Sequence, residues 1–224
     1  MKRAPRRIDQ DRLKGLLGCH LAMYRTKTPH YQAAMLDTLL DIWKCYHSRL
    51  LDIGGGTGVI AEAIAKFFPV GSVVTVDVAD RFCSTLSVET RRYDGHSLPF
   101  CDSEFDAATL NNVLHHVPVD NRPHLLREIR RVVRGPLYVK DHESRSILDD
   151  LRLTALDAIG NIPFGGMLWA RYFTMVEWEQ LAESTGYEIA AVVGADYRAT
   201  PYDMAFPNRL EVTMRFEPKA SAEL

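Results

Sequence analysis

Three features are scarce in this sequence, and each scarcity excludes a class of protein. The four cysteines are scattered over 224 residues without a Cys-x-x-Cys pair, which indicates neither a disulfide scaffold nor a zinc site. No apolar run approaches the roughly 18 residues of a membrane helix, and no apolar segment follows the basic start. The 27 basic and 29 acidic side chains nearly cancel, unlike the positive excess of nucleic-acid-binding proteins. We therefore expect a cytoplasmic protein with no membrane span, no nucleic-acid partner and no metal.

Apolar residues and one run of glycines are what the chain does have. Hydrophobic residues make up 46% of it, which at this length is enough for one domain with a full core. Residues 50–60 read Leu-Leu-Asp-Ile-Gly-Gly-Gly-Thr-Gly-Val-Ile, a predicted strand that ends in an acid and runs into four glycines before an apolar helix. Glycine has no Cβ and tolerates φ > 0, so the backbone can approach a ligand closely at this turn.

The spacing of these glycines separates the ligand classes. In a dinucleotide fingerprint counted from Gly54, the third glycine would stand at position 59, which is Val59. No Lys-Ser/Thr pair follows, so the turn is not a phosphate-binding P-loop. The run of Asp52, Gly54, Gly56 and Gly58 resembles motif I of the class I S-adenosylmethionine (SAM) dependent methyltransferases. The resemblance implies that the turn wraps the methionine and ribose parts of SAM, and that Asp52 helps to fix the amino group, partly through water.

A second acid follows at the expected distance. The β-branched run 72–76 is typical of a buried strand, and it ends at Asp77. An acid at such a strand tip can accept both hydroxyls of a ribose. NAD-dependent enzymes share this acid, and a cap of the next helix is a further alternative, so Asp77 by itself indicates only nucleoside binding. Under the resemblance, Asp77 holds the ribose of SAM and Val78 lies beside it.

Two further segments extend the resemblance. Residues 93–100, Tyr-Asp-Gly-His-Ser-Leu-Pro-Phe, are similar to the family's D-x-x-x-L-P-F segment, which places Asp94 and Gly95 at the adenine. Residues 106–110 form a predicted fourth strand, followed by Asn111 beside the methionine part of SAM and by a Leu-His-His run common in the family. The match covers about residues 48–140. It departs at residues 131–136, where the family usually has Pro-Gly-Gly before strand five.

The resemblance implies a Rossmann-like α/β fold in one domain over residues 1–224, with helices on both faces of a seven-stranded, mostly parallel sheet whose last strand is antiparallel. Residues 209–216 alternate apolar and polar, which favours a half-exposed antiparallel strand next to strand five. Two predicted helices within residues 1–47 form the cap that family members lay over the SAM pocket. Residues 144–173 add an amphipathic helix, a glycine-rich loop and an aromatic cluster. They predict a lid over an acceptor pocket, with an oligomer interface such as a homodimer as the alternative.

Histidines at strand ends are the candidates for chemistry. Methyl transfer from a sulfonium is a direct displacement, so the protein chiefly aligns the nucleophile and excludes water. A hydroxyl or amine acceptor also needs a base, and histidine titrates near neutral pH. His115, His116 and His142 stand at predicted strand ends. We expect His142, next to Asp141 after strand five (137–140), to be the base, with His116 as the second candidate; a structural role is the alternative for each.

The sequence therefore predicts a SAM-dependent methyltransferase that methylates an oxygen, nitrogen or carbon of a small molecule in a biosynthetic pathway and releases S-adenosylhomocysteine. Methylation of RNA or protein is the first alternative, and the balanced charge and the aromatic insertion argue against it. A non-catalytic SAM-fold partner subunit is the second, and the intact motif acids and glycines argue against that. An NAD-linked oxidoreductase conflicts with Val59. The acceptor itself is not predicted, because pockets vary independently of the fold.

Overall fold

Seven strands form one sheet in the order β3-β2-β1-β4-β5-β7-β6. The computed structural model describes residues 7–161 and 169–219. Strand β7 is antiparallel to both of its neighbours, and the other adjacent strands pair in parallel. The predicted Rossmann-like architecture, with its antiparallel last strand next to strand five, is confirmed. The strands are β1 (His47–Ile53), β2 (Val70–Asp77), β3 (Glu89–Arg92), β4 (Ala107–Asn111), β5 (Leu137–His142), β6 (Tyr187–Val193) and β7 (Glu211–Pro218).

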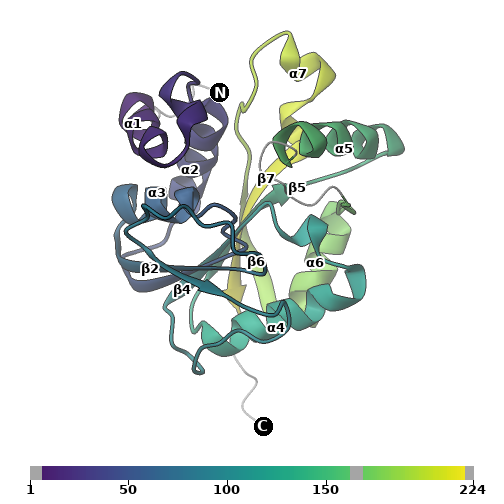
Figure 1. Ribbon diagram of the computed structural model, residues 1–224. Coiled ribbons are helices and arrows are strands. Elements are labelled where there is room, and N and C mark those ends of the chain that lie inside the picture. Colours follow the sequence, from purple (N-terminus) through teal and green to yellow (C-terminus); the bar gives the residue numbers. More distant parts are fainter. Residues whose placement is uncertain (1–6, 162–168, 220–224) are drawn as a thin grey trace.

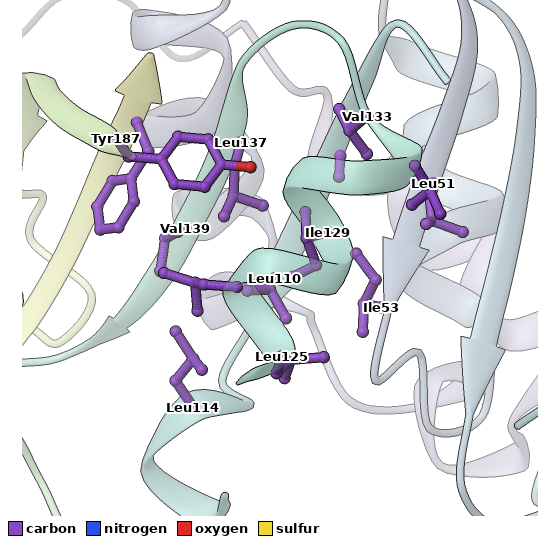
Figure 2. Packing of buried hydrophobic residues seen from close by; sticks show 14 of the residues in the cluster. Leu51, Ile53, Leu110, Leu114, Leu125, Ile129, Val133, Leu137, Val139 and Tyr187 are labelled. Atoms are coloured by element: carbon purple, nitrogen blue, oxygen red, sulfur yellow. The ribbon is translucent and has the colours of Figure 1, made fainter. Parts of the chain in front are cut away.

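Helices cover both faces of the sheet, and each face has its own apolar core (Figure 1). Neighbouring strand residues point to opposite faces of a sheet. Leu50 therefore packs in the core under the first three α-helices of the chain, and Leu51 packs in the core under the fourth and sixth α-helices. Figure 2 shows the core that contains Leu51, where Ile129 packs among Leu110 and Val139 of the central strands. The helices are α1 (Gln10–His20), α2 (His30–Ile42) and α3 (Val59–Phe67) on one face, and α4 (Arg122–Val132) and α6 (Met175–Ser184) on the other.

Two strands differ from their prediction. Strand five was expected to end at residue 140, but Asp141 and His142 pair with Val212 and Glu211, so β5 continues to His142. Strand β7 is not half-exposed as predicted, because it lies between β5 and β6 and α2 packs on it. Glu211 and Thr213, on the strand's polar side, are therefore buried. The polar positions of the alternating pattern therefore lie on a second face of β7 that is also buried.

The segments expected to be the cap and the lid lie at identifiable places. Helix α2 packs on β5, β6 and β7, and α1 packs on α3. Helix α5 (Ile147–Asn161) follows β5 and lies beyond the ends of β5 and β7 (Figure 1). Residues 162–168 of the expected lid lie outside the described residues. The functions of residues 1–47 as a cap and of 144–173 as a lid stay predictions. Short helical turns complete the described chain: η1 (Ala22–Arg25), η2 (Leu114–His116), η3 (Val119–Asn121), α7 (Tyr202–Ala205) and η5 (Asn208–Leu210).

Within the described ranges, every helix is too short or too polar to cross a membrane.

Candidate functional site

The glycine turn between β1 and α3 holds three residues in the left-handed region, Gly54 (φ +73°), Gly56 (φ +58°) and Gly58 (φ +81°). A Cβ at Gly54 would lie 2.5 Å from Cγ2 of Val113, and one at Gly58 would lie 2.3 Å from Cδ1 of Leu86. Packing inside the protein therefore excludes a side chain at these two positions. A Cβ at Gly56, in contrast, would meet no atom within 4 Å. Gly56 presents bare backbone to open space, which is the shape of a ligand cradle.

Asp77, at the end of β2, reaches back to this turn. Its Oδ2 accepts the N–H of Gly56 at 2.8 Å, and its Oδ1 accepts the N–H of Ala79 at 2.9 Å. Gly95, in the loop after β3, lies against Val78, since a Cβ on it would be 3.3 Å from Cγ1 of Val78. The fold thus brings Asp77 next to Gly56, and it brings Gly95 next to Val78, the residue that follows Asp77.

Asp94 lies at the exposed edge of the same region. Its Oδ1 accepts the backbone N–H groups of Ser97 and His96, each at 2.8 Å. These two bonds lower the pKa of Asp94 and hold its carboxylate in one position beside Gly95. A contact with the adenine of SAM stays a prediction.

Asp52 lies under the turn and is 2% exposed. Its carboxylate accepts hydrogen bonds from the hydroxyls of Thr109 at 2.7 Å and Thr75 at 2.9 Å, and from Nδ2 of Asn111 at 3.2 Å. The Oδ1 of Asn111 is buried and has no hydrogen-bond partner among the described residues. Asn111 therefore offers an acceptor atom beside the turn, while Asp52 fixes Asn111 and its neighbouring strands.

Asp52 should make stability depend on pH. Burial raises its pKa to about 6, against the lowering effect of its three hydrogen bonds. An unfolded aspartate titrates near pH ~3.9. The folded chain thus holds this proton more tightly, so the contribution to stability is complete below about pH 4 and is lost as the pH rises through 6. We expect the wild type to lose on the order of 3 kcal/mol relative to Asp52→Asn between about pH 4 and 6 in urea unfolding.

Asp106 provides a control of opposite sign. Its backbone hydrogen bonds from Arg49 and Ser48 outweigh burial and lower its pKa. It therefore contributes stability above the pH range where an unfolded aspartate titrates. As the pH falls, the free energy of unfolding of the wild type should fall relative to that of Asp106→Asn. If the free energies of unfolding of Asp52→Asn and the wild type instead depend on pH in the same way, the raised pKa of Asp52 is contradicted.

A second cluster of polar side chains lies at the ends of β4, β5 and β7. Lys140 and Glu211 form an ion pair with side chains that are both 0% exposed, and Arg198 also contacts Glu211. The Nζ of Lys140 donates to Oη of Tyr31 at 2.5 Å and to Oδ1 of Asn112 at 2.7 Å. Asn112 has φ +57°, a left-handed conformation that Lys140 helps to hold. Burial lowers the pKa of Lys140, but Glu211 outweighs it and raises that pKa.

His142 extends this network. Its Nδ1 lies 3.1 Å from Oε2 of Glu211, and its Nε2 lies 3.6 Å from Oδ1 of Asp157 on α5. Burial by itself would lower the pKa of His142, but Glu211 raises it to about 9. A histidine that already holds a proton at neutral pH cannot accept another. The structure thus does not favour His142 as the predicted base, and it gives this residue the role of offsetting two buried carboxylates.

Asp141 and His115 form a close pair beside it. Oδ1 of Asp141 lies 2.5 Å from Nδ1 of His115, and its Oδ2 accepts the N–H of Leu114 at 3.1 Å. Burial raises the pKa of Asp141, but His115 outweighs this and the pKa falls to about 2. On its other side, Nε2 of His115 lies 3.4 Å from Oδ2 of Asp157, which accepts the hydroxyl of Tyr172 at 2.6 Å.

Helix α5 turns an acidic side toward the protein. Asp149 and Leu153 are buried, and Asp157, one turn further on, contacts His115 and His142. The apolar side of this predicted amphipathic helix is exposed: Ile147, Leu148, Leu151 and Ile159. Hydrophobic spacing alone missed Asp157. The signal that could have found it is the four-residue spacing of 149, 153 and 157 along one side of the helix.

His116 completes the group of predicted site residues. It is half-buried, its ring centroid lies 4.0 Å from that of His115, and its Nδ1 lies 2.8 Å from the carbonyl oxygen of Trp169. Burial, and then His115, lower its pKa, so it is neutral near pH 7. The structure thus brings His115, His116 and His142 together around Asp157.

A cavity of 450 Å³ lies beside this cluster, between the first turns of α5 and residues 170–177. Tyr172 and Thr154 line it, while the glycine turn and the three histidines do not. It belongs to the insertion that was predicted to shape the acceptor pocket.

Comparison with known proteins agrees with this geometry. Residues 51–135 match a family described as "Methyltransferase domain". Over this segment the chain is thus similar to methyltransferase domains, as the resemblance in the sequence implied. The matched segment contains the glycine turn, Asp77, Asp94 and the Leu-His-His run, which carried the resemblance in the sequence.

Similar proteins come from several organisms. The chain is 36% identical over 100 residues to 2-phytyl-1,4-naphtoquinone methyltransferase of Synechococcus elongatus, a match covering 38% of this chain and 41% of that protein. The match thus spans less than half of that relative's length.

Two solved structures are similar over almost the whole chain, and at their level of identity they show the fold alone. A Haloferax volcanii methyltransferase in complex with the Trm112 methyltransferase activator has a TM-score of 0.65 and 14% identity, covering 94% of this chain and 95% of that one. Magnesium protoporphyrin IX methyltransferase of Synechocystis with bound S-adenosylhomocysteine has a TM-score of 0.59 and 14% identity, covering 93% and 94%.

Proposed function

We propose that this chain is an enzyme that transfers the methyl group of SAM to a small-molecule acceptor. The observation that carries the proposal is the bare backbone of Gly56, which faces open space and is joined to Asp77 by a hydrogen bond. The match of residues 51–135 to a methyltransferase domain supports the choice of SAM over NAD.

The residues around the turn fit the parts of SAM. Bound SAM supplies a methyl group already activated by its positive sulfur. The carboxylate of Asp77 would accept the ribose hydroxyls, because each of its oxygens has a second lone pair beyond its bond to the backbone. The buried, unpartnered Oδ1 of Asn111 suits the ammonium group of the methionine part. Val78, Asp94 and Gly95 would line the adenine.

The acceptor side is supported by a short connection from the turn to the histidines. The segment after β4 contacts the turn through Val113, against Gly54, and reaches His115 and His116 within three residues. A molecule bound against His116 would therefore lie next to the cofactor. His116 is neutral near pH 7 and His142 is protonated, so His116 is the better placed of the two predicted histidines to serve the acceptor.

One relative also supports a small acceptor, since it acts by name on a naphthoquinone. The buried cluster at the ends of β4, β5 and β7 suits an enclosed reaction better than an open groove.

Titration calorimetry with SAM, S-adenosylhomocysteine and NAD tests the cofactor. We expect binding of the first two and none of NAD. Methyl transfer is then assayed with panels of small hydroxylated and amino compounds, of RNA and of peptides. Turnover confined to RNA or peptides would replace the proposed acceptor class, and SAM binding without turnover on any panel would favour a non-catalytic partner subunit.

Asp77→Ala should weaken SAM binding by about 1.5–3 kcal/mol, the range for hydrogen bonds to a charged group. The substitution removes both the ribose acceptor and the bond that positions Gly56. Asp80→Ala, an exposed carboxylate three residues away, is the matched control and should bind SAM as the wild type does. Equal affinity of a folded Asp77→Ala variant and the control would remove Asp77 from the cofactor site.

A further inference from the structure

The cluster around His115 has the donor set of a transition-metal site. One candidate ligand atom each from His115, His116 and Asp157 lies within 4.8 Å of the other two. Two imidazoles and one carboxylate are a recurrent ligand set for zinc and for iron(II). These three residues come from η2 and α5, so only the fold brings them together.

The orientation of His115 is the strongest sign of a missing ligand. Its Nδ1 faces Asp141, and its Nε2 is buried without a hydrogen-bond partner in residues 7–161 and 169–219. The Oδ2 of Asp157 lies 3.4 Å from this nitrogen. Two donors that each lie ~2.0–2.1 Å from a tetrahedral metal are ~3.4 Å apart. The separation thus matches a shared metal better than a direct hydrogen bond.

The surroundings also match those of metal-bound histidines. Such histidines usually give their second ring nitrogen to a carboxylate or a backbone carbonyl, which fixes the ring. His115 faces Asp141 in this way, and His116 faces the carbonyl of Trp169 at 2.8 Å. A second grouping, of His115 with Asp141 and His142, fits less well. Asp141 already binds backbone N–H groups, and His142 lies against Glu211.

We propose that His115 and His116, each through Nε2, and the carboxylate of Asp157 bind one divalent transition-metal ion, with zinc as the reference ion. Asp141 and the Trp169 carbonyl orient the two rings. Three protein ligands leave a fourth position open for water or a substrate oxygen.

The role of this metal site in methyl transfer rests on the proposed function, whereas the binding of the metal does not. An acceptor hydroxyl in the open position would become more acidic, as water bound to zinc does, and would release its proton to solvent water. Its oxygen would then form a bond to the methyl carbon of SAM as the carbon–sulfur bond breaks, leaving S-adenosylhomocysteine. His116 would then serve as a ligand, and no histidine base would be needed.

The experiment uses the full chain without an affinity tag, stripped of metal by a chelator and dialysed. Zinc binding is measured by calorimetry and elemental analysis, and cobalt(II) is added as a spectroscopic probe of tetrahedral geometry. We expect one zinc per chain and visible cobalt absorption bands. His115→Gln and Asp157→Asn should each lower zinc affinity at least ~100-fold, and Asp141→Asn should lower it ~10–100-fold with the ligands intact.

His124→Gln changes a histidine on α4 that lies outside the cluster, and it should bind zinc as the wild type does. Circular dichroism and urea unfolding report whether each variant is folded. If His115→Gln does not fold, the test rests on Asp157→Asn, because Asp157 is only half-buried. Failure of the folded wild type to bind zinc, or unchanged affinity in Asp157→Asn, would overturn the site. Because zinc is titrated without SAM, this result is independent of cofactor binding and of methyl transfer.

Discussion

Gly56→Val is expected to abolish SAM binding while the chain stays folded. The added Cβ would meet no protein atom within 4 Å, so the space it fills is the space proposed for the ligand. We expect the dissociation constant for SAM to rise at least ~100-fold, which corresponds to roughly 2.7 kcal/mol. Calorimetry with SAM and with S-adenosylhomocysteine measures the loss.

Backbone strain must be separated from this loss. Gly56 has φ +58°, where a residue with a side chain costs about 1–2 kcal/mol. Gly186 is a matched control, because it has φ +82°, also has open space around its Cβ position, and lies between α6 and β6. Gly186→Val should lose similar thermal stability and keep its SAM affinity. Retained binding in Gly56→Val would mean that the cofactor lies elsewhere.

Glu211→Gln should destabilise the fold by about 3–5 kcal/mol, the range for an ion left buried without its partner. Glu211 is fully buried and offsets three cationic side chains, Lys140, Arg198 and His142. Lys140→Met should lower the free energy of unfolding by less, because Glu211 keeps its contacts with Arg198 and His142. Urea unfolding of both single variants and the double variant measures the difference, and the double variant should lose less than the sum.

Lys44 and Glu217 form the control pair, since Lys44 is 56% exposed. Lys44→Met should change stability by at most about 1 kcal/mol. A similarly small loss in Glu211→Gln would show that the buried charges are not coupled as their distances indicate.

Local signals were sufficient for the cofactor half of the site. The glycine turn, the β-branched run before Asp77 and the Leu-His-His segment each lie within a few residues, and each adjoins a strand of the parallel part of the sheet. Strands in such a sheet end at one edge, so residues that follow them must meet there. For this reason Asp77 lies at the backbone of Gly56 and Gly95 lies against Val78, while their contacts with SAM stay predictions.

The acceptor half was decided by the tertiary structure. The sequence determined that β7 alternates, but only its place between two strands and under α2 buried Glu211 beside Lys140. The sequence placed His142 at a strand end, but its charge depends on Glu211, which lies 69 positions further along, and on Asp157 of α5. A pKa depends on distances to charges and on exclusion from water, and neither follows from local spacing. The chain by itself thus determined where the strands lie in the sequence and where the glycine turn forms, whereas folding decided which side chains share one buried space and which of them hold a proton.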